Sequence, residues 1–98
     1  MNFTSEKRCA PRSPCNEKVT FRVSALPGGP VPLVQSMTGT VVDISATGMG
    51  VATMEMLHKG QLIVFDRDQP NWQLPTQGLI VWTCQSHQGY RAGIEFIL

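Results

Sequence analysis

The sequence lacks the long apolar run that a membrane-spanning helix requires. A helical crossing of a bilayer takes roughly 20 consecutive apolar residues, and polar or charged residues interrupt this 98-residue sequence well before that length. Residues 1–14 are polar and contain no apolar core, so we expect no secretory signal there. These absences predict a protein that does not insert into a membrane and that resides in the cytoplasm.

An excess of charge of one sign is also missing. Eight basic and seven acidic residues nearly cancel, which leaves a formal net charge of +1. A general nucleic-acid or membrane-surface binder usually carries a larger basic excess. Any anion-binding site must therefore be local, and Lys7, Arg8 and Arg12 supply three of the eight basic residues near the N-terminus.

Cysteine is scarce, and its spacing does not predict a metal site. Cys9, Cys15 and Cys84 are an odd number without paired spacing, which fits a reducing cytosol better than a disulfide framework. Cys9 and Cys15 have no second pair or nearby histidine to complete a zinc site, so we expect no bound metal. His58 and His87 fall in separate predicted turns without a catalytic constellation, and we expect no enzyme activity.

A sustained helical period is absent, and alternation of apolar and polar residues takes its place. Val19, Phe21 and Val23 alternate with Thr20 and Arg22, a pattern typical of a half-buried strand. Six such strands, separated by turns rich in glycine and proline, predict an antiparallel barrel or sandwich. The expected extended segments are 18–24, 33–45, 49–54, 61–66, 78–84 and 90–98.

The N-terminal residues 1–17 are predicted to form an arm, and residues 18–98 a single domain. Pro11 and Pro14 oppose helix formation in the arm. In an extended arm, Arg8 and Arg12 lie roughly 13 Å apart at about 3.3 Å per residue. A guanidinium binds phosphate bidentately and also matches the O6 and N7 acceptors of guanine, so the pair suits a nucleotide. Alternatively, two exposed arginines in a tail serve only solubility.

The segment from Val41 to Gly48 combines a predicted strand with a turn. On a strand, Asp43 and Ser45 point to the same face, and we expect Gly48 to supply backbone freedom for the turn. The carboxylate of Asp43 suits the amino or imino edge of guanine, and the hydroxyl of Ser45 suits a base or a phosphate. Alternatively, aspartate and serine near glycine bond their own backbone and only form a turn.

The two tryptophans are additional candidates for contact with a base. Aromatic side chains bind bases by stacking, and Trp72 and Trp82 are available for this. A tryptophan on a strand of a small barrel is, however, more typical of the core.

Together these motifs resemble the signature of PilZ domains, which are bacterial receptors for cyclic di-GMP. The resemblance covers nearly the whole chain, and five short motifs in this order are specific although each is weak alone. The motifs are Arg8-x-x-x-Arg12, Asp43-x-Ser45-x-x-Gly48, Leu57-x-x-Gly60, the strand 78–82 and the segment 90–96.

The resemblance implies a six-stranded antiparallel β-barrel and a cyclic di-GMP site without any other cofactor. In such a site the two arginines hold guanine and phosphate groups, and the Asp-x-Ser-x-x-Gly motif lines the opposite side. The residue before the first arginine influences whether one or two ligand molecules bind. The ligand-binding residues implied in this way are Lys7, Arg8, Arg12, Asp43, Ser45 and Gly48.

The resemblance also implies how a signal leaves the domain. Many PilZ domains carry a helix after the last strand, and here we expect it to be short or missing because the sequence ends at Leu98. We expect the arm to order on ligand binding and a separate effector protein to sense the change. Two alternatives remain open: a PilZ-like interaction module without nucleotide binding, and a barrel for single-stranded nucleic acid, which the small net charge disfavours. The oligomeric state does not follow from the sequence.

Overall fold

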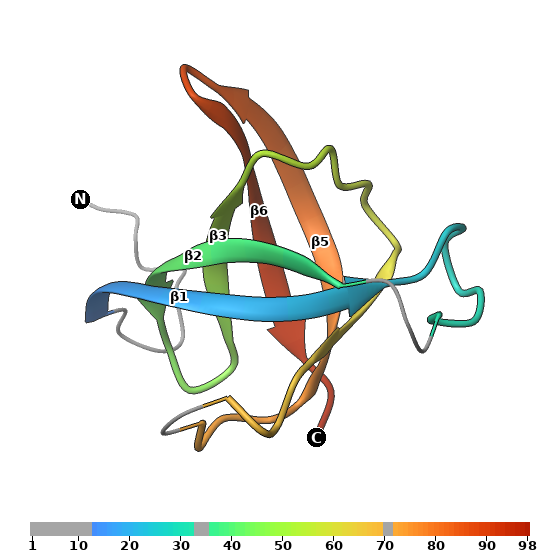
Figure 1. Cartoon of the computed structure of the whole chain (residues 1–98), viewed down its shortest axis with the longest axis horizontal. Helices are drawn as coiled ribbons and strands as arrows, with labels where there is room; N and C mark the ends of the chain where they lie inside the picture. The colour runs from blue at the N-terminus through green and yellow to red at the C-terminus, as the bar shows by residue number, and fades with distance from the viewer. Residues whose placement is uncertain (1–12, 33–35, 70–71) are drawn as a thin grey trace.

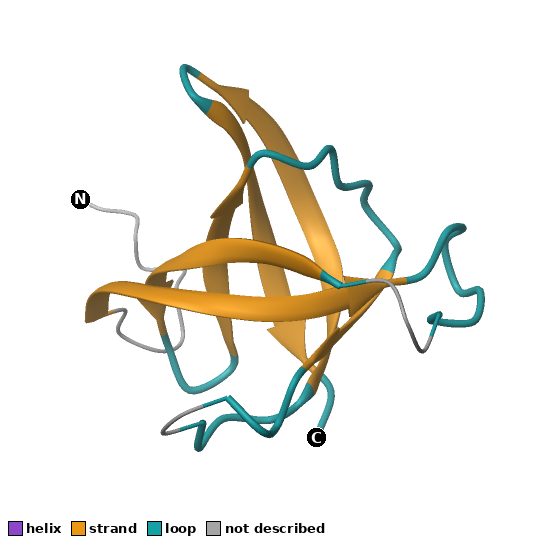
Figure 2. Cartoon of the chain, viewed as in Figure 1, coloured by secondary structure: helices purple, strands orange, loops and turns teal. Residues whose placement is uncertain are grey.

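The computed structural model describes residues 13–32, 36–69 and 72–98, and all of its regular structure is β (Figure 2). The prediction of an all-β chain with six antiparallel strands is therefore confirmed, and the described residues contain no helix, hence none that crosses a membrane. The strands are β1 (Ser13–Val23), β2 (Met37–Ile44), β3 (Gly48–Thr53), β4 (Leu62–Phe65), β5 (Gln77–Ser86) and β6 (Gly89–Phe96).

The six strands pair in the order β1-β2-β3-β6-β5-β4, and β4 returns to β1 to make a closed barrel. The closing seam is short, because only Phe21–Val23 of β1 pair with Ile63–Phe65 of β4. In Figure 1, β1 and β2 cross over β3, β6 and β5 at a steep angle, and the β5–β6 hairpin extends beyond them.

The core fills the barrel because alternate residues of each strand point inward. Phe21 and Phe65 are buried and meet edge to face, with ring centroids 6.1 Å apart. Trp72, in the loop after β4, stacks on Phe65 at 5.0 Å and adds to the core from outside the strands. The buried cluster comprises Val19, Phe21, Val23, Val41, Met49, Val51, Leu57, Ile63, Phe65, Ile80, Ala92, Ile94 and Phe96.

The first strand begins earlier than the sequence predicts. Residues 13–17, which precede the predicted strand 18–24, form the first part of β1. Proline is tolerated at Pro14 because this part of β1 pairs only with β2, where the register shifts between Pro14 and Glu17. Residues 1–12 lie outside the described part of the chain.

The connections between the strands are irregular. The segment 55–60 contains no helical turn, and the described part of 68–75 contains no strand. The strand predicted over 33–45 begins at Met37, and residues 33–35 are not described. β5 and β6 form a hairpin that turns at 86–89, since Ser86 pairs with Gly89.

Candidate functional site

The turn between β2 and β3 is held by hydrogen bonds that its own residues make. The amide of Ser45 donates to the carbonyl of Gly48 at 2.8 Å, and its buried hydroxyl donates to the same carbonyl at 3.3 Å. The amide of Thr47 donates in turn to the Ser45 hydroxyl at 3.3 Å. Ser45 therefore bonds to the backbone of its own turn. This is the alternative to ligand contact that the sequence analysis left open.

Asp43 is aimed at the outer face of the barrel by a bulge. Val41 pairs with Val51 and Asp43 with Gly50, so Val42 is an extra residue that no residue of β3 opposes. Because side chains alternate along a strand, this extra residue moves Asp43 from the core side, where Val41 points, to the outside. Its Oδ1 atom accepts a hydrogen bond of 3.0 Å from the amide of Gly50.

Gly48 is required for a reason other than the one the sequence suggested. The described glycines with positive φ are Gly28, Gly60 and Gly89, so the expectation that Gly48 supplies unusual backbone freedom is wrong. A Cβ atom at Gly48 would instead collide with the carbonyl oxygen of Ile94, because β6 passes directly beside it. The glycine therefore allows β3 and β6 to pack closely at the turn.

A row of directly paired residues crosses four strands from Asp43 to Trp82. The two residues between them are Gly50 and Gly93, which we call the glycine floor. Asp43 pairs with Gly50, Gly50 with Gly93, and Gly93 with Trp82. Asp43 covers Gly50, where an added Cβ would lie 3.0 Å from Oδ1, and the five-membered ring of the Trp82 indole covers Gly93. Directly paired residues have Cα atoms about 4.5–5.5 Å apart, so a carboxylate and an aromatic ring lie over adjacent positions on the same outer face.

A family model described as "PilZ domain" matches residues 6–98. The chain belongs to the PilZ domain family. The resemblance in the sequence motifs is thereby confirmed, and PilZ domains are known as receptors for cyclic di-GMP rather than as enzymes. A search of curated proteins gave no match.

The described part of this PilZ domain brings three of the six expected site residues together. Asp43, Ser45 and Gly48 lie on one turn and its flanking strands, while Lys7, Arg8 and Arg12 lie outside the described residues. β1 nevertheless begins at this turn, because Ser13 pairs with Ile44 and Pro14 with Asp43. The segment that carries the arginines therefore joins the barrel beside Asp43.

Trp82 is the site residue of this PilZ domain that reasoning from the sequence underestimated. It was expected in the core, yet its side chain is 47% exposed. The register between β5 and β6 shifts between Ile80 and Trp82, so Val81 is an extra residue and Trp82 turns to the outside. No residue in this segment signals the bulge. Trp72 is partly buried against the core, as expected.

The row of Asp43 and Trp82 lies outside the two hollows found among the described residues of the PilZ domain. Two hollows of about 810 and 690 Å³ are lined by residues other than Asp43, Ser45 and Trp82. Cys15 and Cys84 carry free thiols, and no group of three potential metal ligands occurs within residues 13–32, 36–69 and 72–98. The face thus offers an acceptor, an aromatic ring and flat backbone, which suits a planar ligand with hydrogen-bond donors at its edge.

Proposed function

We propose that this chain is a receptor for cyclic di-GMP and is not an enzyme. The observation that carries the proposal is the row of Asp43, Gly50, Gly93 and Trp82 within a chain of the PilZ family. A guanine base stacks on the Trp82 indole, and the Asp43 carboxylate accepts hydrogen bonds from its amino or imino edge. The glycine floor lets the base approach the backbone closely.

The basic residues of the N-terminal segment supply the positive charge that pairs with the phosphates of the ligand. Arg8 and Arg12 grip the phosphates and the O6 and N7 atoms of guanine, and Lys7 adds to the same anion site. The attachment of β1 beside Asp43 supports this arrangement, because Pro14 pairs with Asp43. Ser45 and Gly48 stabilise the turn between β2 and β3 on the other side of the ligand.

We further propose that residues 1–12 become ordered over this face when the nucleotide binds. The contacts of the arginines must offset the entropy of fixing the backbone. The ordered segment remodels the surface that a separate effector protein meets, which is how a small receptor in the bacterial cytoplasm transmits the signal.

A second candidate function is supported by one specific observation. Ser45 and Asp43 both have hydrogen-bond partners within the β2–β3 region, Gly48 and Gly50 respectively. Side chains that already form hydrogen bonds within the protein suit a PilZ-like interaction module that does not bind nucleotides.

Calorimetric titration with cyclic di-GMP and cyclic di-AMP separates these candidates. Adenine presents an amino donor where guanine presents the O6 acceptor that arginine reads, so we expect clear preference for cyclic di-GMP. Equal binding of the two dinucleotides contradicts the proposed base recognition. Absence of binding to either favours the interaction module.

A further inference from the structure

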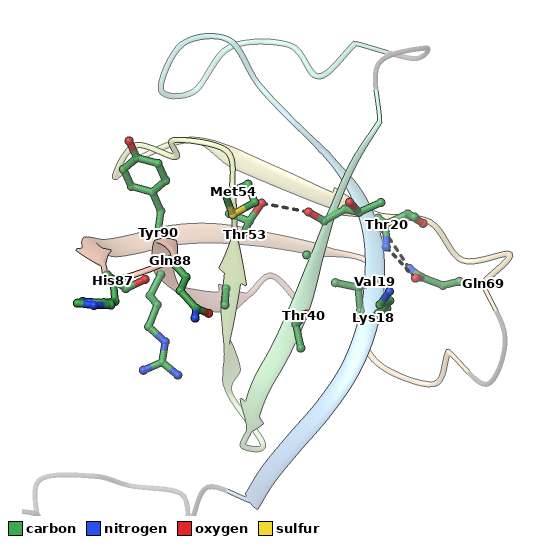
Figure 3. A pocket seen from close by; sticks show the side chains of 15 residues that line it. Lys18, Val19, Thr20, Thr40, Thr53, Met54, Gln69, His87, Gln88 and Tyr90 are labelled. Carbon is green, nitrogen blue, oxygen red and sulfur yellow. Dashed lines mark hydrogen bonds between the residues drawn. The ribbon is translucent and has the colours of Figure 1, made fainter.

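A groove of about 810 Å³ crosses the outside of the barrel (Figure 3). Its floor follows the strand register, in which Lys18 pairs with Thr40, Thr40 with Ala52, and Ala52 with Arg91. Ala52 and Arg91 are each two residues along their strands from the glycine floor. In Figure 3, Thr20 and Gln69 stand on the side of the groove opposite His87 and Gln88.

The groove is basic at both ends. Lys18 and Arg91 are exposed, and neither makes an ion pair with a carboxylate in the part of the chain that the structure describes. None of the residues that line the groove is an aspartate or a glutamate. In a protein whose net charge is only +1, the groove is a local concentration of unneutralised positive charge.

The middle of the groove offers hydrogen bonding and one apolar contact. The side chains of Thr38, Thr40 and Gln88 make no hydrogen bond to another described residue. Met54, at the edge, is 75% exposed. A ligand between the two cations would therefore meet free hydroxyl and amide groups and a flexible thioether, which adapts to varied partners.

The distance between the two cations limits what fits. Lys18 and Arg91 are separated by three strand spacings, on the order of 14 Å between their backbones at about 4.8 Å each. A single phosphate or carboxylate does not span that distance. An extended peptide places residues four positions apart at roughly 13 Å. A nucleic acid is disfavoured because only two permanently charged residues line the groove and Tyr90 is its single aromatic residue.

We propose that the groove docks an extended acidic segment of a partner protein, with two carboxylates about four residues apart. One carboxylate pairs with Lys18 and the other with Arg91, while the threonines bind the residues between. The inference deepens the proposed function, from which it takes the need for a separate partner. It does not require that the nucleotide occupy the groove.

The test uses nuclear magnetic resonance of the isotope-labelled chain and a short synthetic peptide with two glutamates about four positions apart. We expect saturable shifts at the amides of Thr40, Ala52 and Gln88, and no saturable shifts with the peptide in which glutamine replaces both glutamates. Absence of saturable shifts, or equal shifts with the glutamine peptide, would overturn the proposal.

Charge reversal locates the site. The double variant Lys18→Glu and Arg91→Glu should weaken binding at least about tenfold, because attraction becomes repulsion at both ends. The matched control reverses Lys59 and Arg67, which are exposed and do not line the groove, and should bind as the unchanged chain does. Equal loss in both double variants would show general charge attraction and overturn the specific site.

Competition and a parallel titration distinguish the remaining outcomes. A thymidine oligonucleotide that displaces the peptide from the groove would assign the groove to nucleic acid and overturn the proposal. Cyclic di-GMP binding by each variant is measured separately. A chain that binds cyclic di-GMP but not the peptide leaves the proposed function intact and contradicts only the docking groove.

Discussion

At the scale of single residues, Asp43 has a structural bond as well as a place on the ligand face. Asp43→Ala removes the Oδ1 atom that accepts a hydrogen bond of 3.0 Å from the Gly50 amide. We therefore expect the free energy of unfolding to fall by about 1 kcal/mol. Binding of cyclic di-GMP should weaken by about 1–3 kcal/mol, the scale for losing a charged hydrogen-bond partner. Urea unfolding and calorimetry measure the two effects.

Asp43→Asn separates these roles, because its amide oxygen can still accept from Gly50 while the charge is gone. Stability close to that of the unchanged chain with weakened binding is the expected result. A variant that binds cyclic di-GMP normally would show that the carboxylate charge does not contribute to recognition.

Trp82 is expected to contribute to binding and little to stability, because nearly half of its side chain is exposed. Loss of one base–aromatic stack costs about 1–3 kcal/mol, so Trp82→Ala should weaken cyclic di-GMP binding by that amount. Trp72→Phe makes Trp82 the sole tryptophan of the chain, which has two, and its fluorescence should then be quenched by the nucleotide. Unchanged affinity in Trp82→Ala would remove the indole from the site.

At the scale of secondary structure, Gln69 substitutes for a strand along the free edge of β1. Its side-chain Oε1 accepts from the amide of Thr20 at 3.0 Å, and its Nε2 donates to the carbonyl of Thr20 at 3.1 Å. The same residue of β1 is bound to Asp66 through its hydroxyl at 2.8 Å. The loop after β4 thus continues the seam beyond the three residue pairs of β1 and β4.

Gln69→Ala should therefore lower the unfolding free energy by about 1–3 kcal/mol and speed hydrogen exchange of the Thr20 amide. Gln73→Ala is the matched control, since Gln73 lies exposed in the same loop and makes no hydrogen bond to a described residue. Equal destabilisation of the two variants would show that the loop, and not the Gln69 amide, closes the seam.

At the scale of the whole molecule, ligand binding should couple the N-terminal segment to the barrel. Amide exchange across residues 6–12 is expected to slow at saturating cyclic di-GMP, while the amides of 19–23, within the core strand β1, remain equally protected. Arg8→Ala or Arg12→Ala should abolish both tight binding and the slowing. Unchanged exchange in 6–12 at saturation contradicts the ordering, although the nucleotide still binds.

The strands were predictable where alternation alone decides which side chains are buried. Val19, Phe21 and Val23 are buried as their spacing predicts. The bulges at Val42 and Val81 were not predictable, because an extra residue on one strand is defined only by its partner strand. Each bulge reverses the face of the residue that follows, so Trp82 lies outside although a strand tryptophan of a small barrel is more typical of the core.

The sequence predicts which residues form the candidate site but not which contacts they make within the protein. Asp43, Ser45 and Gly48 were identified, but the role of Gly48 depends on how closely Ile94 approaches from a strand 46 positions later. Ligand contact by Asp43 and Ser45, and by Lys7, Arg8 and Arg12, stays a prediction.

The place of β6 in the sheet has a consequence for synthesis of the chain. β6 is the last of the six strands in sequence, yet it lies between β3 and β5 and pairs with both. Until residues 89–96 emerge from the ribosome, β3 lacks one neighbour and β5 can pair only with β4. Those edges remain open to other chains in the interval, so the barrel is expected to close only after β6 has been synthesised.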